Sequence, residues 1–198
     1  MTRPRRSRMG RGRVFVVSAP SGSGKTTLCR LLLRSVEGLV RSVSVTTRRP
    51  RPGERHRRDY FFTAERSFRE GVRRGKFLEW AQVFGAYYGT PRAPVMRALT
   101  KGWDVLLTLD VEGARQVKKQ FRDAVLVFIR PPSFSVLKER LARRRTDHPV
   151  EMARRLKEAR RETRQIVLYH YAITNRTVAR SLQELKAIIV AERNRITA

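Results

Sequence analysis

The feature that most constrains the fold is a glycine-rich loop between an apolar run and a segment of helical period. Residues 14–17 read Val-Phe-Val-Val, Ala19-Pro-Ser-Gly-Ser-Gly-Lys-Thr26 follows, and leucines then recur at helical spacing from Leu28. A loop in this setting directs backbone N–H groups and a helix N-terminus at an anion. The pattern matches a phosphate loop except that Ala19 stands where the first glycine is usual. We therefore predict a strand, a phosphate-binding loop and a helix in succession.

The rest of the chain divides into an alternating part and a different, inserted part. We predict strands at 103–109, 124–129 and 171–174, and helices at about 112–120, 133–145, 150–168 and 178–193. This alternation predicts an α/β fold with a parallel sheet, helices on both faces and ligands at the carboxyl ends of the strands. We predict an inserted lobe at residues 39 to about 100, a segment rich in Thr, Arg, Pro, Gly and aromatics.

Charge and composition exclude several classes of protein. The chain holds 45 basic and 17 acidic residues, a net charge of +28 that favours an anionic partner without naming it. The longest apolar run, 124–129, is far below the ~18–20 residues of a membrane span. The single Cys29 excludes an internal disulfide framework and is interpreted as a buried packing residue, so we expect a reducing, cytoplasmic setting. Residues 1–12, rich in arginine, read as a disordered basic arm.

The phosphate loop carries specific chemical expectations. Lys25 is expected to reach the β and γ phosphates of a nucleoside triphosphate, and the Thr26 hydroxyl to bind Mg²⁺. Asp110, which ends the predicted strand 103–109, is the second expected Mg²⁺ ligand, with a helix N-cap as the alternative. The residues expected to contact ATP are Ala19, Pro20, Ser21, Gly22, Ser23, Gly24, Lys25, Thr26 and Thr27.

The inserted lobe has the residues for a small anion and a flat base. Arg48 and Arg51, with Tyr60 nearby, suit a monophosphate held by charge-assisted hydrogen bonds. Glu79 stands among aromatic residues, and a carboxylate can accept the N–H donors of a guanine edge. The alternative is that the aromatics simply form the core of the lobe.

These residues carry a resemblance to the guanylate kinase family, from about residue 14 to 193. The stretches that carry it are 18–28, Ser42-Val-Ser-Val-Thr-Thr-Arg-Arg-Pro-Arg-Pro-Gly-Glu54 with Asp59-Tyr60, Phe77-Leu-Glu-Trp80, Tyr87-Tyr-Gly-Thr90, Asp110-Val-Glu-Gly-Ala114 and Pro131-Pro-Ser133. The resemblance implies a P-loop three-layer fold with a central parallel sheet, an inserted GMP-binding lobe and a short lid. It also implies phosphorylation of GMP with ATP and Mg²⁺.

The resemblance further implies the domain boundaries and the role of each residue. The core would comprise 13–40 and 101–198, the lobe about 41–100 and the lid about 140–156. The residues expected at GMP are Ser44, Glu79 and Thr90 on guanine, Arg48, Arg51, Tyr60 and Tyr88 on the phosphate, and Asp110. Those expected to act in catalysis are Lys25, Arg48, Arg144 and Arg155, with Arg140 as a further lid candidate.

The chain departs from the family pattern at a few positions. Thr108 and Glu112 replace an acid and a glutamine, Arg145 replaces the lid glycine, and His170 stands where the family is acidic, as do Arg176 and Thr177. None of these removes a group essential to phosphoryl transfer. They bear on rate, lid motion and contacts with ATP.

Three alternatives differ from this interpretation. A kinase of a phosphorylated sugar would not need Glu79 among aromatics. A non-catalytic binding module would have no use for Gly24-Lys25-Thr26 or for the lid arginines. Contact with nucleic acid through the basic arm could coexist with kinase activity, although the lobe lacks the regular aromatic and basic interleaving of a single-strand groove.

Overall fold

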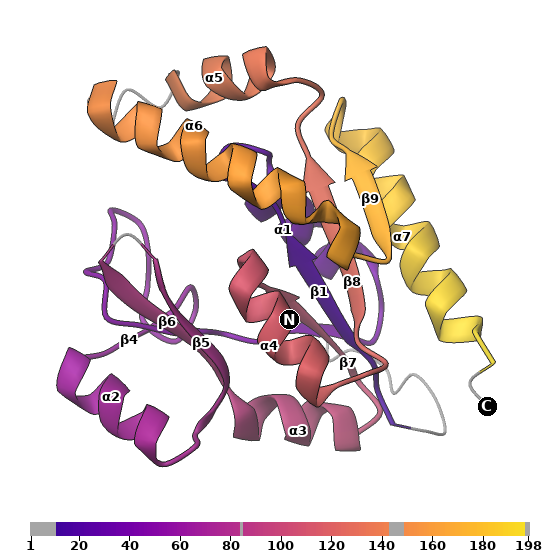
Figure 1. Ribbon diagram of the computed structural model, residues 1–198. Coiled ribbons are helices and arrows are strands. Elements are labelled where there is room, and N and C mark those ends of the chain that lie inside the picture. Colours follow the sequence, from indigo (N-terminus) through magenta and orange to yellow (C-terminus); the bar gives the residue numbers. More distant parts are fainter. Residues whose placement is uncertain (1–10, 84, 143–148, 197–198) are drawn as a thin grey trace. The chain divides into compact units, whose positions relative to one another are not determined.

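The computed structural model describes residues 11–83, 85–142 and 149–196, which form two compact units (Figure 1). Of these described residues, the first unit holds those within 11–14, 38–107 and 112–124, and the second holds those within 15–37, 108–111 and 125–196. Each unit contains parallel strands that alternate along the chain with helices, which confirms the predicted α/β class. No helix of the described residues is long and apolar enough to cross a bilayer.

The second unit is built on parallel strands with almost wholly apolar side chains. Strand β1 (Val14–Ser18) pairs with β8 (Val125–Arg130), and β8 pairs with β9 (Tyr171–Thr174). Every residue of β1 is buried, as expected for a parallel strand covered on both faces. Helix α1 (Lys25–Ser35) follows the loop, and α7 (Val178–Asn194) runs beside β9 (Figure 1).

Two further helices of this unit pack on each other. Helix α5 (Phe134–Ala142) and helix α6 (Pro149–Arg164) share a small core of Leu137, Leu141 and Ala159. The helix predicted over 150–168 ends as α-helix at Arg164, and residues Gln165–Leu168 form the 3₁₀ turn η1. Cys29 is buried in α1, which confirms its interpretation as a packing residue.

The first unit contains the strand pair β2 (Leu39–Arg41) and β7 (Asp104–Thr108), which run parallel, with helices α3 (Arg92–Thr100) and α4 (Val111–Gln120). The chain before β1 packs here. The Gly12 N–H donates to the Leu99 carbonyl at 2.9 Å, and a Cβ at residue 12 would lie 1.9 Å from the Trp103 carbonyl oxygen. The expected basic arm 1–12 therefore has an ordered end, while residues 1–10 lie outside the described part.

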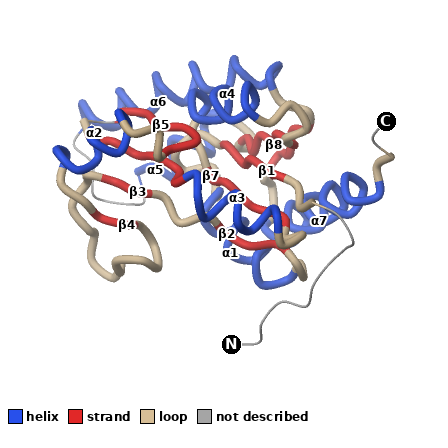
Figure 2. The backbone as a smooth tube through the Cα atoms, turned by 90° about the horizontal axis from the view of Figure 1, so that it is seen from below, coloured by secondary structure: helices blue, strands red, loops and turns tan. Residues whose placement is uncertain are grey.

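The lobe has a sheet of its own, ordered β4-β3-β6-β5. Its strands are β3 (Val45–Thr46), β4 (Phe61–Phe62), β5 (Phe77–Val83) and β6 (Ala86–Pro91), and helix α2 (Glu65–Arg73) lies with them (Figure 2). The buried Phe68 of α2 stacks on Phe77 and Tyr87, with ring centroids 4.6 and 5.4 Å apart. These aromatic residues form the core of the lobe, which the sequence analysis gave as the alternative to binding a base.

Candidate active site

The glycine-rich loop of the second unit has the conformation that its sequence predicts. Gly22 and Gly24 adopt φ angles of 90° and 89°, which residues with a side chain rarely adopt, so these two positions require glycine. The Ser23 N–H donates to the Pro20 carbonyl at 3.1 Å, and the Leu28 N–H donates to the Gly24 carbonyl. Thr26 is exposed in the first turn of α1. The predicted strand, loop and helix are confirmed.

Lys25 is held against the segment that follows β7. Its Nζ donates to the Leu109 carbonyl at 2.9 Å, and the Ser18 hydroxyl donates to the Asp110 carbonyl at 3.4 Å. The Leu109 N–H in turn donates to the Val17 carbonyl at 3.2 Å. The second unit thus brings the start of α1 and residues 109–110 together, as expected for a phosphate loop and its acidic partner.

Glu162 of α6 is a titratable group that the sequence analysis did not select. Burial raises its pKa to about 7; Lys25 opposes the rise through its positive charge, and Glu158 and Asp110 add to it. In the structure Glu162 lies three residues after the buried Ala159 and thus near the buried face of its helix. A carboxyl group that titrates near neutral pH is therefore part of the electrostatic surroundings of Lys25.

The donor atoms of this unit fit Mg²⁺ bound together with a nucleotide. Mg²⁺ prefers oxygen ligands and commonly takes one or two side chains together with substrate phosphates and water. Thr26 offers a hydroxyl and Asp110 a carboxylate. Among the residues that the structure describes, there is no cluster of three or more His, Cys, Asp or Glu residues suited to a metal. Binding shared with phosphates needs no such cluster.

In the first unit, the lobe buries a carboxylate and a hydroxyl side by side. Strands β5 and β6 are antiparallel, and their register pairs Glu79 with Thr90. The Thr90 hydroxyl donates to Glu79 Oε1 at 2.5 Å, and the two residues are 1% and 5% exposed, respectively. A buried carboxylate needs donors to offset its lost hydration, so this pair is well placed to receive the N–H groups of a ligand.

The arginine expected at the acceptor phosphate lies in a second cluster of the lobe. Arg48 Nε donates to the Tyr88 hydroxyl at 3.2 Å, and its Nη2 lies 2.9 Å from each carboxylate oxygen of Glu54. Its guanidinium also lies 5.6 Å from the centre of the Tyr60 ring. Burial disfavours the charge, yet the hydrogen bonds with Glu54 and Tyr88 raise the pKa of Arg48 above its ordinary value.

The structure brings three of the four expected phosphate ligands together in one cluster, and this cluster also includes Glu54. Arg48, Tyr60 and Tyr88 form the cluster, whereas the side chain of Arg51 is exposed and its backbone N–H donates to Glu54 Oε2 at 2.8 Å. Burial raises the pKa of the Tyr60 hydroxyl. Glu54 ends one of the stretches that carry the family resemblance but was not selected as a site residue. Ser44 is half-buried beside β3, and its carbonyl accepts from the Phe61 N–H.

Two glutamines of α4 hold the edge strand of the lobe sheet. Gln116 donates to the Trp80 carbonyl at 2.9 Å and accepts from the Trp80 N–H at 3.2 Å. Gln120 donates to the Leu78 carbonyl. These contacts satisfy backbone groups on both sides of Glu79, so the position of that carboxylate is fixed by backbone as well as by Thr90.

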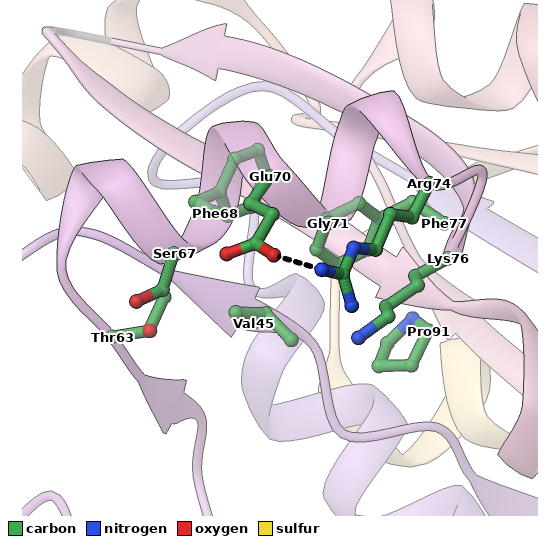
Figure 3. Close-up of a pocket in the computed structure, with 10 residues that line it drawn as sticks. All are labelled: Val45, Thr63, Ser67, Phe68, Glu70, Gly71, Arg74, Lys76, Phe77 and Pro91. Carbon is green, nitrogen blue, oxygen red and sulfur yellow. Dashed lines mark ion pairs between the residues drawn. The ribbon is translucent and has the colours of Figure 1, made fainter.

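The lobe also has a hollow of about 450 Å³ that the sequence did not predict (Figure 3). Glu70 and Arg74 form an ion pair of 2.5 Å at this hollow. Its lining residues are Val45, Thr63, Ser67, Phe68, Glu70, Gly71, Arg74, Lys76, Phe77 and Pro91. None of the residues predicted to contact GMP is among them.

The expected lid residues are only partly within the described chain. Arg155 is half-exposed on α6, and Arg140 of α5 donates to the Asn175 carbonyl at 3.3 Å. Arg144 and Arg145 lie outside the described residues. Of the departures from the family pattern, Glu112 is exposed in the first turn of α4, and His170 accepts the Leu126 N–H through Nδ1 at 3.0 Å.

Comparison with known proteins gives one consistent family. Residues 11–192 match the family model described as guanylate kinase. The chain is 46% identical to a guanylate kinase of Symbiobacterium thermophilum, over 93% of this chain and 88% of the relative, and 47% identical to one of Nitrobacter winogradskyi, over 92% and 84%. A crystal structure of guanylate kinase from Anaplasma phagocytophilum superposes with a TM-score of 0.79 at 33% identity, covering 94% of this chain and 89% of that one. The chain belongs to the guanylate kinase family.

Proposed function

We propose that this protein transfers the γ-phosphoryl group of ATP to the phosphate of GMP, giving ADP and GDP. Family membership supports this reaction. The observation that carries the choice of acceptor is the buried Glu79–Thr90 pair in the lobe. A carboxylate and a hydroxyl held together in a buried position suit the N1–H and 2-amino donors and the O6 acceptor of a guanine edge.

The second unit is assigned the donor nucleotide. Residues 19–27 would wrap the ATP phosphates with backbone N–H groups, and Lys25 would exchange its bond to the Leu109 carbonyl for the β and γ phosphates. Thr26 and Asp110 would hold Mg²⁺, which neutralises charge on the phosphates when bound. Arg155, with Arg144 as its expected partner, would add positive charge as negative charge spreads over the transferred group.

The lobe is assigned the acceptor. Glu79 would accept hydrogen bonds from guanine N1–H and the 2-amino group, with Ser44 and Thr90 as further contacts to the base. Arg48, Tyr60 and Tyr88 would bind the GMP phosphate, with Arg51 turning toward it from its exposed position. Glu54 would hold Arg48 in place, because its carboxylate spans both the Arg48 guanidinium and the Arg51 N–H.

The chemistry needs little beyond position and charge. The GMP phosphate is already largely ionised at neutral pH, so no general base is required to activate it. In-line attack on the γ-phosphoryl is favoured when both groups are held in a fixed orientation and water is excluded. This accounts for a site made of arginines, a lysine and backbone donors.

The test is a coupled assay of ADP formation with GMP, AMP and a sugar phosphate as acceptors. GMP should exceed AMP by about 10³-fold in kcat/KM, because adenine has neither the N1–H nor the 2-amino donors of guanine and turns an acceptor toward the buried carboxylate. Glu79→Gln should reduce GMP activity steeply and change AMP activity little. The control is Glu65→Gln, which removes an exposed carboxylate of α2. The proposal would be contradicted if the protein phosphorylated the sugar phosphate but not GMP. It would also be contradicted if Glu79→Gln kept the wild-type preference for GMP over AMP.

A further inference from the structure

Asn175, the residue directly after β9, is buried, and both ends of its side-chain amide form hydrogen bonds beside the phosphate loop. It is 3% exposed. Its Nδ2 donates to the Ser23 carbonyl at 2.8 Å, and its Oδ1 accepts from the Ser181 hydroxyl at 3.1 Å. A carbonyl can only accept, so the amide nitrogen must face Ser23. The loop is therefore tied to a residue 152 positions away.

Asn175 also fills the space next to Gly24. A Cβ at residue 24 would lie 2.4 Å from Asn175 Nδ2, closer than such atoms approach. The glycine is therefore needed for two reasons, the φ angle of 89° and the neighbouring amide. The loop and Asn175 are complementary in shape as well as in hydrogen bonding.

The bond to Ser23 has a directional consequence for the loop. The peptide between Ser23 and Gly24 is planar and trans, so its carbonyl and its N–H point in opposite directions. Because Asn175 holds the carbonyl on its own side, the Gly24 N–H is turned to the other side. Backbone N–H groups of such a loop are the donors that bind phosphate.

We propose that Asn175 is a positioning residue that presets the Gly24 N–H for the donor phosphates by holding the Ser23 carbonyl. The proposal rests on the assignment of ATP to this loop. The Asn175 carbonyl also accepts from Arg140 of α5, and its N–H donates to the Arg130 carbonyl at 2.9 Å. The residue that orients the loop is thereby fixed by α5, α7 and the end of β8.

The sharpest variant is Asn175→Asp, which keeps the shape and places a carboxylate oxygen against the Ser23 carbonyl. Two acceptors repel each other, so the peptide should lose its preset direction. We expect the KM for ATP to rise about 10-fold or more, with the KM for GMP little changed. Asn194→Asp, at the exposed end of α7, makes the same chemical change as a control and should leave both constants unchanged.

A second measurement keeps the test decisive if Asn175→Asp does not fold. Ser181→Ala removes only the hydroxyl that holds Asn175 Oδ1, and it should raise the KM for ATP about 2- to 5-fold. A selective effect on ATP supports the positioning role. An unchanged KM for ATP in the variants that fold, or equal rises for ATP and GMP, overturns it.

Melting without nucleotide tests the contact itself and separates it from the proposed reaction. Gly24→Ala should lower the Tm less in an Asn175→Ala background than in the wild type, because the collision with the amide is gone and only the φ strain remains. Equal losses of Tm would exclude the packing on which the proposal depends. Absence of GMP phosphorylation by the wild-type protein would instead contradict the proposed function, and equilibrium binding of ATP would then replace the KM for ATP.

Discussion

Replacing Glu162 by glutamine should make the ligand-free protein more stable at high pH and leave it little changed at low pH. The physical cause is burial, which raises the pKa of this carboxyl from 4.5 to about 7. The positive charge of Lys25 lowers this pKa, and the negative charges of Glu158 and Asp110 raise it further. Glutamine has the same shape and never ionises. It therefore removes the cost of charging the side chain in the folded state.

The sign and size follow from linkage. A carboxyl whose pKa is higher in the folded than in the unfolded state is protonated in both states below pH 4.5, so folding is not penalised there. Between pH 4.5 and about 7 the unfolded chain ionises first, and the stability contributed by this group falls as the pH rises. At ~1.4 kcal/mol per unit of pKa, the loss reaches about 3 kcal/mol above pH 7.

Urea unfolding from pH 5 to 8.5, without nucleotide and with EDTA, measures the effect. The free energy of unfolding of Glu162→Gln minus that of the wild type should grow by about 2–3 kcal/mol across this range. Glu184→Gln on α7, which removes a more exposed carboxylate paired with Arg180, should show a nearly constant difference. A constant difference for Glu162→Gln would refute the role assigned to its burial.

Three further predictions concern the proposed reaction. Lys25→Ala should reduce kcat at least about 100-fold, because the positive charge expected to contact the phosphates is lost, and it should keep the fold, because Lys25 is the partly exposed first residue of α1. Kinetics and circular dichroism check this, and retention of a tenth of wild-type turnover would contradict it. Arg155→Ala should lower kcat more than it raises the KM for GMP, because the charge of Arg155 matters most in the transition state. An unchanged kcat would show that other arginines stabilise the transferred group. Deletion of residues 2–10 should leave GMP turnover intact and weaken salt-sensitive binding to nucleic acid, and a large fall in turnover would show that the arm belongs to the site.

The sequence by itself determined the parts of this protein whose signals are local. The phosphate loop with Lys25 and Thr26 is one contiguous segment, and the apolar strand before it and the helical period after it are read over a few residues. The last strand, 171–174, was predicted with its observed bounds. Glu79 could be selected because a carboxylate among aromatic neighbours stands out along the chain itself.

The tertiary structure alone decided which distant groups meet. Thr90 bonds Glu79 through the register of β5 with β6, and Asn175 reaches Ser23 because β9 ends beside the loop. The buried surroundings of Glu162 come from the packing of α6. Hydrogen bonding and burial depend on neighbours brought together by strand order and helix packing. Period and composition report only which face of its own element a residue occupies.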